Sequence, residues 1–257
     1  MLYKLFVIAQ RITSKLPIAY EMVWKVRYEL SHIRGTTYTE PEPVSSRREL
    51  KTIFSSYHEL KIWGNDESVS GLGSSLQYTR SIRNALPKLF RKYNVRSVLD
   101  APCGDFHWMK DVNFDPPILY VGGDIVEKLI QTNSAYASAT RQFISINITE
   151  DQLPVVDLWL CRDCMMHFSH ETIFRTINNY LKSRIPFLLL TNYNCSRVNK
   201  EINDGSYWPL NFHQRPFFFP PAIEYIRDYV YPHEPRWLGL WSRDQLVHWS
   251  AHGARHH

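Results

Sequence analysis

The sequence predicts an α/β protein with a mainly parallel sheet, because short apolar runs typical of strands alternate with segments long enough for helices or crossovers. A chain of 257 residues, 44% of them hydrophobic, can bury one large core. On such sheets, ligands bind outside the carboxyl ends of the strands. The runs are VRSVLDAP (95–102), ILYVGGDIV (118–126), QFISINIT (142–149), VVDLWLCRD (155–163), PFLLLTNYN (186–194) and, as a last strand, RWLGLWS (236–242).

The chain before these runs divides into two parts. Residues 1–48 are expected to form a helical extension and a linker, since Pro41 and Pro43 interrupt residues 34–48. Residues 49–257 then form the main domain. Its helix before the first strand is expected over residues 75–93, where apolar positions recur at helical spacing and Pro87 allows a bend.

Residues 1–20 have an amphipathic pattern. Their longest apolar run, Leu5 to Ala9, is too short for a transmembrane helix, and a cleaved signal peptide is not expected. The segment could lie on a membrane surface or dock on the body of the protein, and docking is the favoured interpretation.

The charge and the cysteines limit the classes of function. A net charge of +5 permits a nucleic-acid partner, but Lys and Arg do not gather into one run, so a nucleic-acid-binding protein is the weaker alternative. The four cysteines are too few for a disulfide scaffold, which favours a reducing, cytoplasmic setting. Cys161 and Cys164 form a C-x-x-C motif without a second pair at zinc spacing, so we expect no metal site and activity that survives chelation.

Polar residues and a glycine follow four consecutive strand-like runs. Because the carboxyl ends of parallel strands meet at one edge of a sheet, these residues are expected to line one ligand site. A glycine there lets a ligand approach the backbone, and an acid after the second strand is placed to bind a ribose. The residues are Asp100 and Gly104 after the first run, Asp124 after the second, Asn147 after the third, and Arg162 and Asp163 at the end of the fourth.

The stretch DAPCGDF (100–106) resembles the loop after the first strand of class I S-adenosylmethionine-dependent methyltransferases, commonly D/E-x-G-x-G-x-G. It keeps Asp100 and the central Gly104, but Pro102 and Phe106 stand at the outer glycine positions. The resemblance implies a Rossmann-like fold with a mainly parallel seven-stranded sheet, helices on both faces and S-adenosylmethionine as cofactor. It implies a cofactor site made by Trp63, Ser74, Asp100, Ala101, Pro102, Gly104, Asp124, Ile125, Asn147, Ile148, Cys161 and Arg162.

The same resemblance assigns roles to three of these residues. Gly104 approaches the amino-acid portion of the cofactor, Asp124 binds the ribose hydroxyls, and Asn147 lies near the adenine amino group. The alternative enzyme is an NAD-dependent Rossmann oxidoreductase, but G-x-G-x-x-G is absent after the first strand. The missing glycines weaken this alternative more, because a pyrophosphate must rest on the helix N-terminus.

The fourth run continues into DLWLCRDCMMHFS (157–169), which resembles a motif of small-molecule O-methyltransferases with an acid followed by a histidine. His167 is expected to be the catalytic base, oriented or charge-stabilised by Asp163, and Asp163 acting alone is the second choice. Such a carboxylate would raise the pKa of the histidine. The alternative is a packed histidine, with Asp163 capping the following helix.

Several features concern the acceptor. The fourth run lacks the N/D-P-P-Y/F of enzymes that methylate amino groups of bases, which favours an oxygen acceptor. The combination of W-G-x-x-x-S-x-S-G-x-G-S (63–74), L-D-A-P-C-G-D-F (99–106) and P-L-N-F (209–212) is similar to methyltransferases associated with surface-polysaccharide and glycan modification. This implies a small-molecule or glycan acceptor with a sugar hydroxyl.

Two segments are expected to shape the site. Residues 63–80, rich in glycine and serine, are expected to form a lid over the cofactor, with a plain surface loop as the alternative. The aromatic residues within 206–230 are expected mainly in the core, although some could stack on a sugar ring.

Overall fold

The structure, a computed structural model, describes Met22, Val26 and residues 50–252. The predicted extension and linker (1–48), with the surface or docking segment of residues 1–20, lie outside the described residues except for Met22 and Val26, whose side chains are exposed. Within the described ranges, no helix is both long and apolar enough to cross a membrane.

Seven strands form one sheet in the order β3-β2-β1-β4-β5-β7-β6. Strands β1 to β5 are parallel, whereas β7 is antiparallel to both β5 and β6. This confirms the predicted mainly parallel, seven-stranded sheet. The strands are β1 (Ser97–Asp100), β2 (Leu119–Asp124), β3 (Arg141–Ser145), β4 (Leu158–Cys161), β5 (Phe187–Asn192), β6 (Glu224–Arg227) and β7 (Trp237–Ser242).

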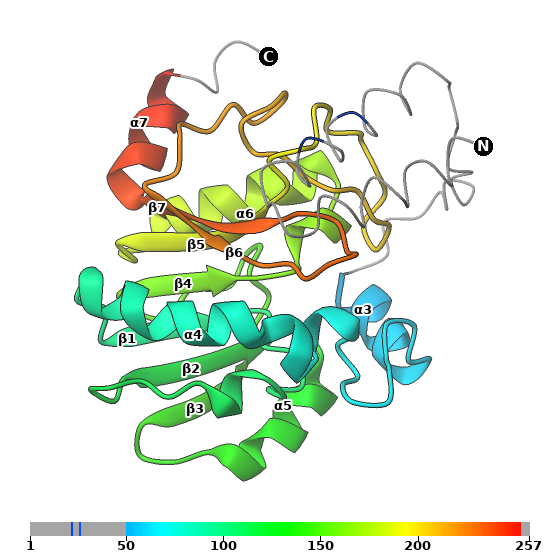
Figure 1. Cartoon of the computed structure of the whole chain (residues 1–257), viewed down its shortest axis with the longest axis vertical. Coiled ribbons are helices and arrows are strands. Elements are labelled where there is room, and N and C mark those ends of the chain that lie inside the picture. Colours follow the sequence, from blue (N-terminus) through cyan, green and yellow to red (C-terminus); the bar gives the residue numbers. More distant parts are fainter. Residues whose placement is uncertain (1–21, 23–25, 27–49, 253–257) are drawn as a thin grey trace.

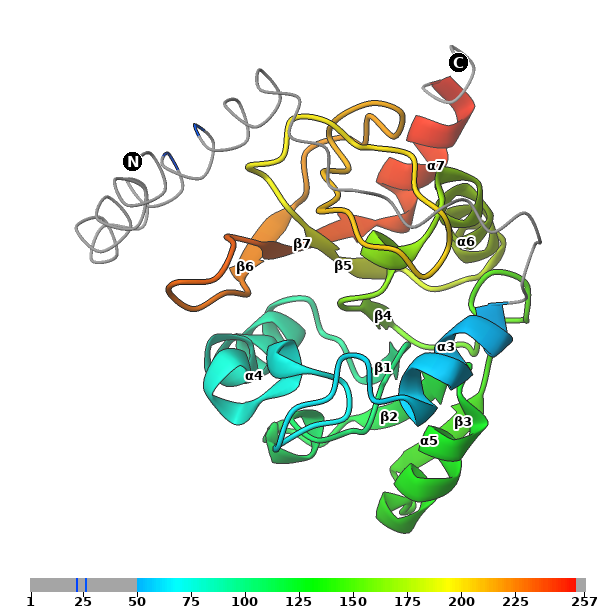
Figure 2. The same cartoon turned by 90° about the vertical axis from the view of Figure 1, so that its right-hand side faces the viewer.

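Helices cover both faces of the sheet, as predicted (Figures 1 and 2). Helix α4 (Leu76–Lys92) packs on one face, and α6 (His170–Lys182) and α7 (Arg243–His252) pack on the other, because their apolar residues belong to two separate core clusters. Helix α5 (Glu127–Asn133) contacts β2 and β3. Helix α3 (Leu50–Glu59) lies near the carboxyl ends of the central strands (Figure 2).

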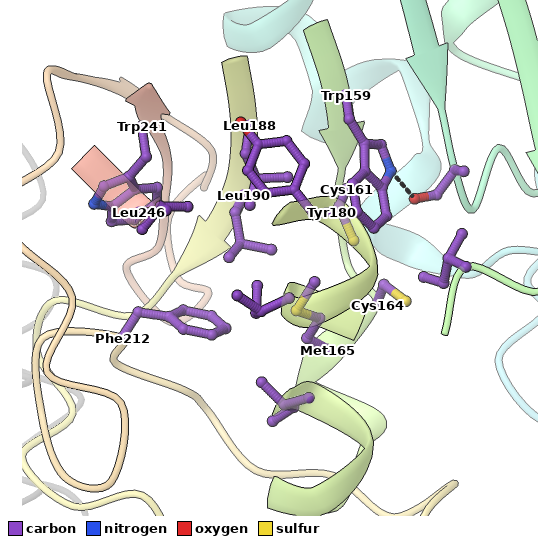
Figure 3. Close-up of a cluster of buried hydrophobic side chains, with 14 of the residues drawn as sticks. Trp159, Cys161, Cys164, Met165, Tyr180, Leu188, Leu190, Phe212, Trp241 and Leu246 are labelled. Carbon is purple, nitrogen blue, oxygen red and sulfur yellow. Dashed lines mark hydrogen bonds between the residues drawn. The ribbon is translucent and has the colours of Figure 1, made fainter. Parts of the chain in front are cut away.

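Strand β4 shows why the core has two halves. All four of its residues are buried, and alternate side chains point to opposite faces: Leu158 and Leu160 join the cluster of α4, whereas Trp159 and Cys161 join that of α6. Figure 3 shows Trp159 and Cys161 beside Tyr180 of α6, with the Trp159 indole N–H donating to the Ala101 carbonyl at 2.9 Å. Burying each large apolar side chain contributes about 1.5–3 kcal/mol, so this central strand is a major source of stability.

The helix ends follow ordinary capping chemistry. The Ser75 hydroxyl accepts the Tyr78 N–H at 3.3 Å at the start of α4, and the Ser169 hydroxyl accepts the Thr172 N–H at 3.2 Å at the start of α6. Helix α4 therefore agrees with the helix predicted over residues 75–93, and it continues through Pro87.

The strand ends place the polar residues at one edge of the sheet. Asp100 is the last residue of β1 and Asp124 the last of β2, and Arg162 directly follows β4. The order of the sheet reverses between β1 and β4, since the chain first moves outward to β3 and then returns to the other side of β1. Ligands on open α/β sheets bind outside the carboxyl ends at such a reversal.

Candidate active site

A cavity of about 590 Å³ lies at this edge, bounded by the strand ends, by α3 and by residues 63–74. Of the predicted lid, Trp63 and residues 69–74 line the cavity, whereas residues 76–80 belong to the first turns of α4. Ala101 and Cys161 do not line the cavity, because both are fully buried in the core. The predicted site residues that do line it are Trp63, Ser74, Asp100, Pro102, Gly104, Asp124, Ile125, Asn147, Ile148, Arg162, Asp163 and His167.

Asp124 fixes the turn that follows β1. Its Oδ2 accepts the Gly104 N–H at 3.0 Å, and its Oδ1 accepts the Val126 N–H at 3.0 Å. Each carboxylate oxygen has a second lone pair, so Asp124 can also accept hydrogen bonds from a ligand. Burial raises the pKa of Asp124 to about 6, against the lowering effect of these backbone N–H groups.

Asp100 supports the floor of the cavity. Its Oδ2 accepts the phenol O–H of Tyr120 at 2.6 Å inside the protein. Burial raises the pKa of Asp100 to about 7, although the Tyr120 hydrogen bond and the positive charge of Arg162 act in the opposite direction. Asp100 is thus held by the core on one side while it lines the cavity on the other.

The turn after β1 needs only one glycine because Phe106 also adopts the left-handed backbone conformation that usually favours glycine. Gly104 has φ 55°, and a Cβ there would lie 2.4 Å from the Ser70 hydroxyl, so the residue must be small. Phe106 also has a positive φ, 56°, and its ring packs against Tyr120 and Phe143 at centroid distances of 5.1 and 5.0 Å. Phe106 therefore keeps the loop conformation while its side chain fills the core.

Asn147 lines the cavity, but its side chain is engaged in the turn after β3. Its Nδ2 donates to Glu150 at 2.7 Å, and its Oδ1 accepts the Thr149 hydroxyl at 2.9 Å and the Thr149 N–H at 3.1 Å. Ile125 and Ile148 add apolar surface to the cavity wall. The cavity wall formed by Ile125 and Ile148 is therefore apolar. The neighbouring amide of Asn147 already has hydrogen-bond partners within the protein.

Four charged side chains form a cluster beyond β4. Arg162 donates from Nε and Nη2 to the two carboxylate oxygens of Asp228, each at 2.9 Å, and from Nη2 to the Gly73 carbonyl at 2.7 Å. Arg236 donates to Asp163 Oδ2 at 2.7 Å and lies 3.3 Å from Asp228 Oδ2. Sequence reasoning missed Asp228 and Arg236, whose only signal is their position directly after β6 and directly before β7.

Asp163 leaves one oxygen without a partner. Its N–H donates to the Thr191 hydroxyl at 2.9 Å, whereas its Oδ1 is buried and has no hydrogen-bond partner in the described part of the chain. Burial opposes ionisation, but Arg236 and Arg162 lower the pKa of Asp163 below its ordinary value. The alternative that Asp163 caps the next helix is wrong, because Ser169 caps α6. Asp163 therefore lines the cavity as an ionised side chain with one buried acceptor oxygen that has no hydrogen-bond partner within the described residues.

His167 is oriented by a backbone carbonyl. Its Nδ1–H donates to the Ser206 carbonyl at 2.8 Å, and because a carbonyl only accepts, Nε2 carries the lone pair. Burial lowers the pKa of His167, against the raising effects of the Ser206 hydrogen bond and of Asp163. The expectation that Asp163 raises this pKa above its ordinary value is therefore wrong, since desolvation outweighs the carboxylate.

Aromatic rings surround His167. The imidazole lies 4.9 Å from the ring of Trp63 and 5.8 Å from that of Tyr207, measured between centroids. The Tyr207 hydroxyl lies 3.4 Å from that of Tyr193 and 3.1 Å from Glu234 Oε2. Tyr207 is the residue of the aromatic segment 206–230 that lines the cavity, whereas its neighbours in the segment, among them Phe212, Phe217 and Phe219, are core residues.

The cysteine pair belongs to the core. Figure 3 shows Cys161 and Cys164 among the apolar side chains between β4 and α6. Hydrogen bonding with Cys161 and burial raise the pKa of the Cys164 thiol, which keeps it protonated. Over the residues that the structure describes, no group of three or more His, Cys, Asp or Glu side chains is arranged to hold a metal ion.

Comparisons with known proteins relate the fold to solved structures. No protein-family model and no curated protein sequence matches the chain. A SAM-dependent methyltransferase from Leishmania major is similar with a TM-score of 0.57 and 10% identity, over 75% of this chain and 83% of that one. Magnesium protoporphyrin IX methyltransferase from Synechocystis PCC 6803, solved with bound SAH, is similar with a TM-score of 0.50 and 12% identity, over 75% of this chain and 99% of that one. The chain therefore has the Rossmann-like fold of class I methyltransferases.

Proposed function

We propose that this protein is an S-adenosylmethionine-dependent methyltransferase. The observation that carries the proposal is the contact between Asp124 and Gly104, which places an acid after β2 beside a glycine turn after β1 in a cavity at the carboxyl edge. An acid in this place suits a ribose, and a turn with a single glycine exposes less backbone than a pyrophosphate needs, which suits a cofactor without one. The bound SAH of the Synechocystis enzyme, which shares the fold, supports the same cofactor.

The cavity residues fit the parts of this cofactor. Asp124 retains lone pairs for the ribose hydroxyls, and Ile125 and Ile148 provide apolar contact for the adenine. Gly104 and Ser74 both line the cavity, and Gly104, which has no side chain, lets the amino-acid portion approach the backbone. A cavity of about 590 Å³ lies within the range of sites that hold drug-sized ligands.

The chemistry requires a base near the acceptor. When bound, S-adenosylmethionine supplies an electrophilic methyl group, so the protein mainly positions the acceptor and removes its proton. His167 Nε2 can accept that proton, because Nδ1–H is engaged with the Ser206 carbonyl and a lowered pKa keeps the imidazole neutral at pH 7. The negative charge of Asp163 then stabilises the imidazolium that forms.

The acceptor that this environment favours is a hydroxyl of a sugar or glycan precursor. Asp163 lines the cavity and its buried Oδ1 has no hydrogen-bond partner among the described residues, and the phenol groups of Tyr193 and Tyr207 stand at the same cavity. The rings of Trp63 and Tyr207 add apolar planes. Flat apolar surfaces beside several polar groups suit a ring that carries hydroxyls.

Calorimetry on the wild-type protein tests the cofactor. We expect S-adenosylmethionine and S-adenosylhomocysteine to bind, and NAD and a generic oligonucleotide to give no heat of binding. Binding of NAD with no binding of S-adenosylmethionine would replace the proposal with an oxidoreductase. A methyl-transfer screen with sugars and nucleotide sugars then identifies the acceptor class.

The substitution His167→Ala tests the base. It should lower turnover by about 100-fold or more and leave cofactor affinity nearly unchanged, because the interaction is made in the transition state. His248→Ala, at an exposed position of α7, is the matched control. Loss of cofactor affinity, or turnover equal to the control in the folded variant, would make His167 a packing residue.

A further inference from the structure

One carboxylate attaches the lid, residues 63–74, to the turn after β1. Asp105 Oδ2 accepts the Ser68 hydroxyl at 2.7 Å and the Val69 N–H at 2.9 Å. The Ser70 hydroxyl lies 3.3 Å from Asp105 Oδ1 and accepts the Asp105 N–H at 3.1 Å. Ser68 is only 3% exposed, so water competes little for the bond between its hydroxyl and Asp105. Asp105 thus binds three consecutive lid residues.

The turn that carries Asp105 is itself held from the cavity side. The Gly104 N–H donates to Asp124, and the Gly104 carbonyl accepts Asn133 Nδ2 at 2.8 Å. The two neighbouring residues therefore have different partners, since Gly104 contacts the proposed ribose acid and Asp105 contacts the lid. Because these two hydrogen bonds hold the turn in place, Asp105 is a fixed point of attachment for the lid.

Two further lid residues, Glu67 and Gly73, hold the lid on either side of this anchor. Glu67 Oε1 accepts the Leu76 N–H at 2.7 Å and lies 2.9 Å from His107 Nε2, and the Gly73 carbonyl accepts Arg162 at 2.7 Å. Glu67 is exposed, so its contacts are the more easily replaced by water. The contacts of Asp105 lie between these two and include the buried side chain of Ser68.

We infer that Asp105 is a positioning residue that fastens the lid over the cofactor cavity and controls how fast the cofactor product leaves. The inference rests on the proposed function. A ligand enclosed by residues 63–74 leaves only when this segment moves, and the movement must break the bonds of Asp105. Asp105 bonds the lid at Ser68 and Val69, whereas His167 packs on Trp63 at the start of the lid, so the methyl-transfer step should depend on Asp105 less than product release does.

Amide hydrogen exchange of the ligand-free protein tests the fastening without cofactor. Asp105→Ala should accelerate exchange of the Val69 amide by about tenfold or more, since that N–H loses its acceptor. Asp66→Ala, in the exposed part of the same lid, should leave Val69 unchanged. Asp105→Asn keeps one carbonyl acceptor and should have an intermediate effect, which also guards against a folding defect in the alanine variant.

The dissociation rate of S-adenosylhomocysteine tests whether Asp105 controls the release of the cofactor product. Trp63 and Trp108 line the cavity and report binding by fluorescence, so stopped-flow displacement gives the dissociation rate. This rate should rise by about tenfold or more in Asp105→Ala and stay at the wild-type value in Asp66→Ala. Single-turnover methyl transfer at saturating cofactor should change less than about threefold.

The outcomes separate the two claims. If wild-type protein binds no S-adenosylhomocysteine in calorimetry, the proposed function is wrong. If it binds, but Val69 exchange and product release in folded Asp105→Ala match the Asp66→Ala control, the fastening by Asp105 is wrong. Adding Ser68→Ala to Asp105→Ala removes, beyond the shared hydrogen bond, only the 3.1 Å bond that the Ser70 N–H donates to the Ser68 hydroxyl, so the further change should be smaller than that of Asp105→Ala alone.

Discussion

The carboxylate of Asp124 is buried, yet it has lone pairs that the protein does not use. Asp124→Ala should weaken S-adenosylmethionine binding by about 1.5–3 kcal/mol, the scale of losing charge-assisted hydrogen bonds to two hydroxyls. Calorimetry on the folded variant measures this. An unchanged affinity would remove Asp124 from the cofactor site.

The ionisation of Asp124 gives a second expectation. Burial raises the pKa of Asp124 from the ordinary 3.8 to about 6, so the folded protein without cofactor favours the protonated carboxyl more than the unfolded chain does. The free energy of unfolding therefore falls as the pH rises from 3.8 to about 6. A protonated carboxyl accepts hydrogen bonds less well, so cofactor affinity should fall as the pH drops from 7 through 6. Asp124→Asn should flatten this dependence in calorimetric titrations.

The lowered pKa of His167 leads to a prediction for the pH dependence of kcat/KM. Since burial lowers its pKa below the ordinary 6.5, kcat/KM should rise with pH through an apparent pKa below that value and be level at pH 7. Asp163→Asn removes a charge that raises this pKa, so it should move the midpoint lower still. A midpoint above 7, or one that moves upward in Asp163→Asn, would contradict the assignment.

Individual site residues could be predicted only where their position on a strand determines their place. Asp100 and Asp124 end parallel strands, so their meeting at one edge follows from the topology. The Ser206 carbonyl and the Asp228 carboxylate come from segments far along the chain, and no local pattern specifies what they contact. The pKa of His167 was predicted in the wrong direction because burial cannot be read from spacing.

Among the structural elements, the lid packs closely against the Asp163–Arg236 ion pair at Gly73. A Cβ there would lie 2.9 Å from Asp163 Oδ2 and 3.1 Å from Arg236 Nη2, and Gly73 lies outside the left-handed region, so alanine adds a methyl group without backbone strain. Gly73→Ala should displace this ion pair and lower turnover by about tenfold or more. Gly64→Ala, whose Cβ would meet its nearest neighbour at 3.4 Å, is the control, and equal activities would exclude the ion pair from catalysis.

The elements themselves were largely predictable. The apolar runs predicted β1 to β5 and β7. The central strands β1, β4 and β5 read as hydrophobic stretches because they are parallel and buried. Strand β6 was not predicted from the residues, since its four residues EYIR are only partly buried and lie in an aromatic, proline-rich segment. It forms because β7 provides a partner edge, which is a tertiary effect.

At the scale of the whole molecule, Asp228 joins the last hairpin to the end of β4. Its side chain is fully buried and accepts hydrogen bonds from Arg162. Asp228→Ala would leave two arginines without a full counter-charge, and this should lower the free energy of unfolding by about 3–5 kcal/mol in denaturant titrations. Asp244→Ala, at an exposed position of α7, should change it by less than about 0.5 kcal/mol. Equal values would show that the cluster does not hold the fold together.

The same cluster has a consequence for assay conditions. Arg162 and Arg236 are balanced by Asp163 and Asp228, and the four groups neutralise one another at close range within the protein. Dissolved ions screen charges over about 8–10 Å in ordinary buffers, but they reach exposed groups far more effectively than buried pairs. The catalytic end of the cavity should therefore keep its electrostatic character across a wide range of ionic strength, whereas weak association through the exposed lysines and arginines should fade as salt is added.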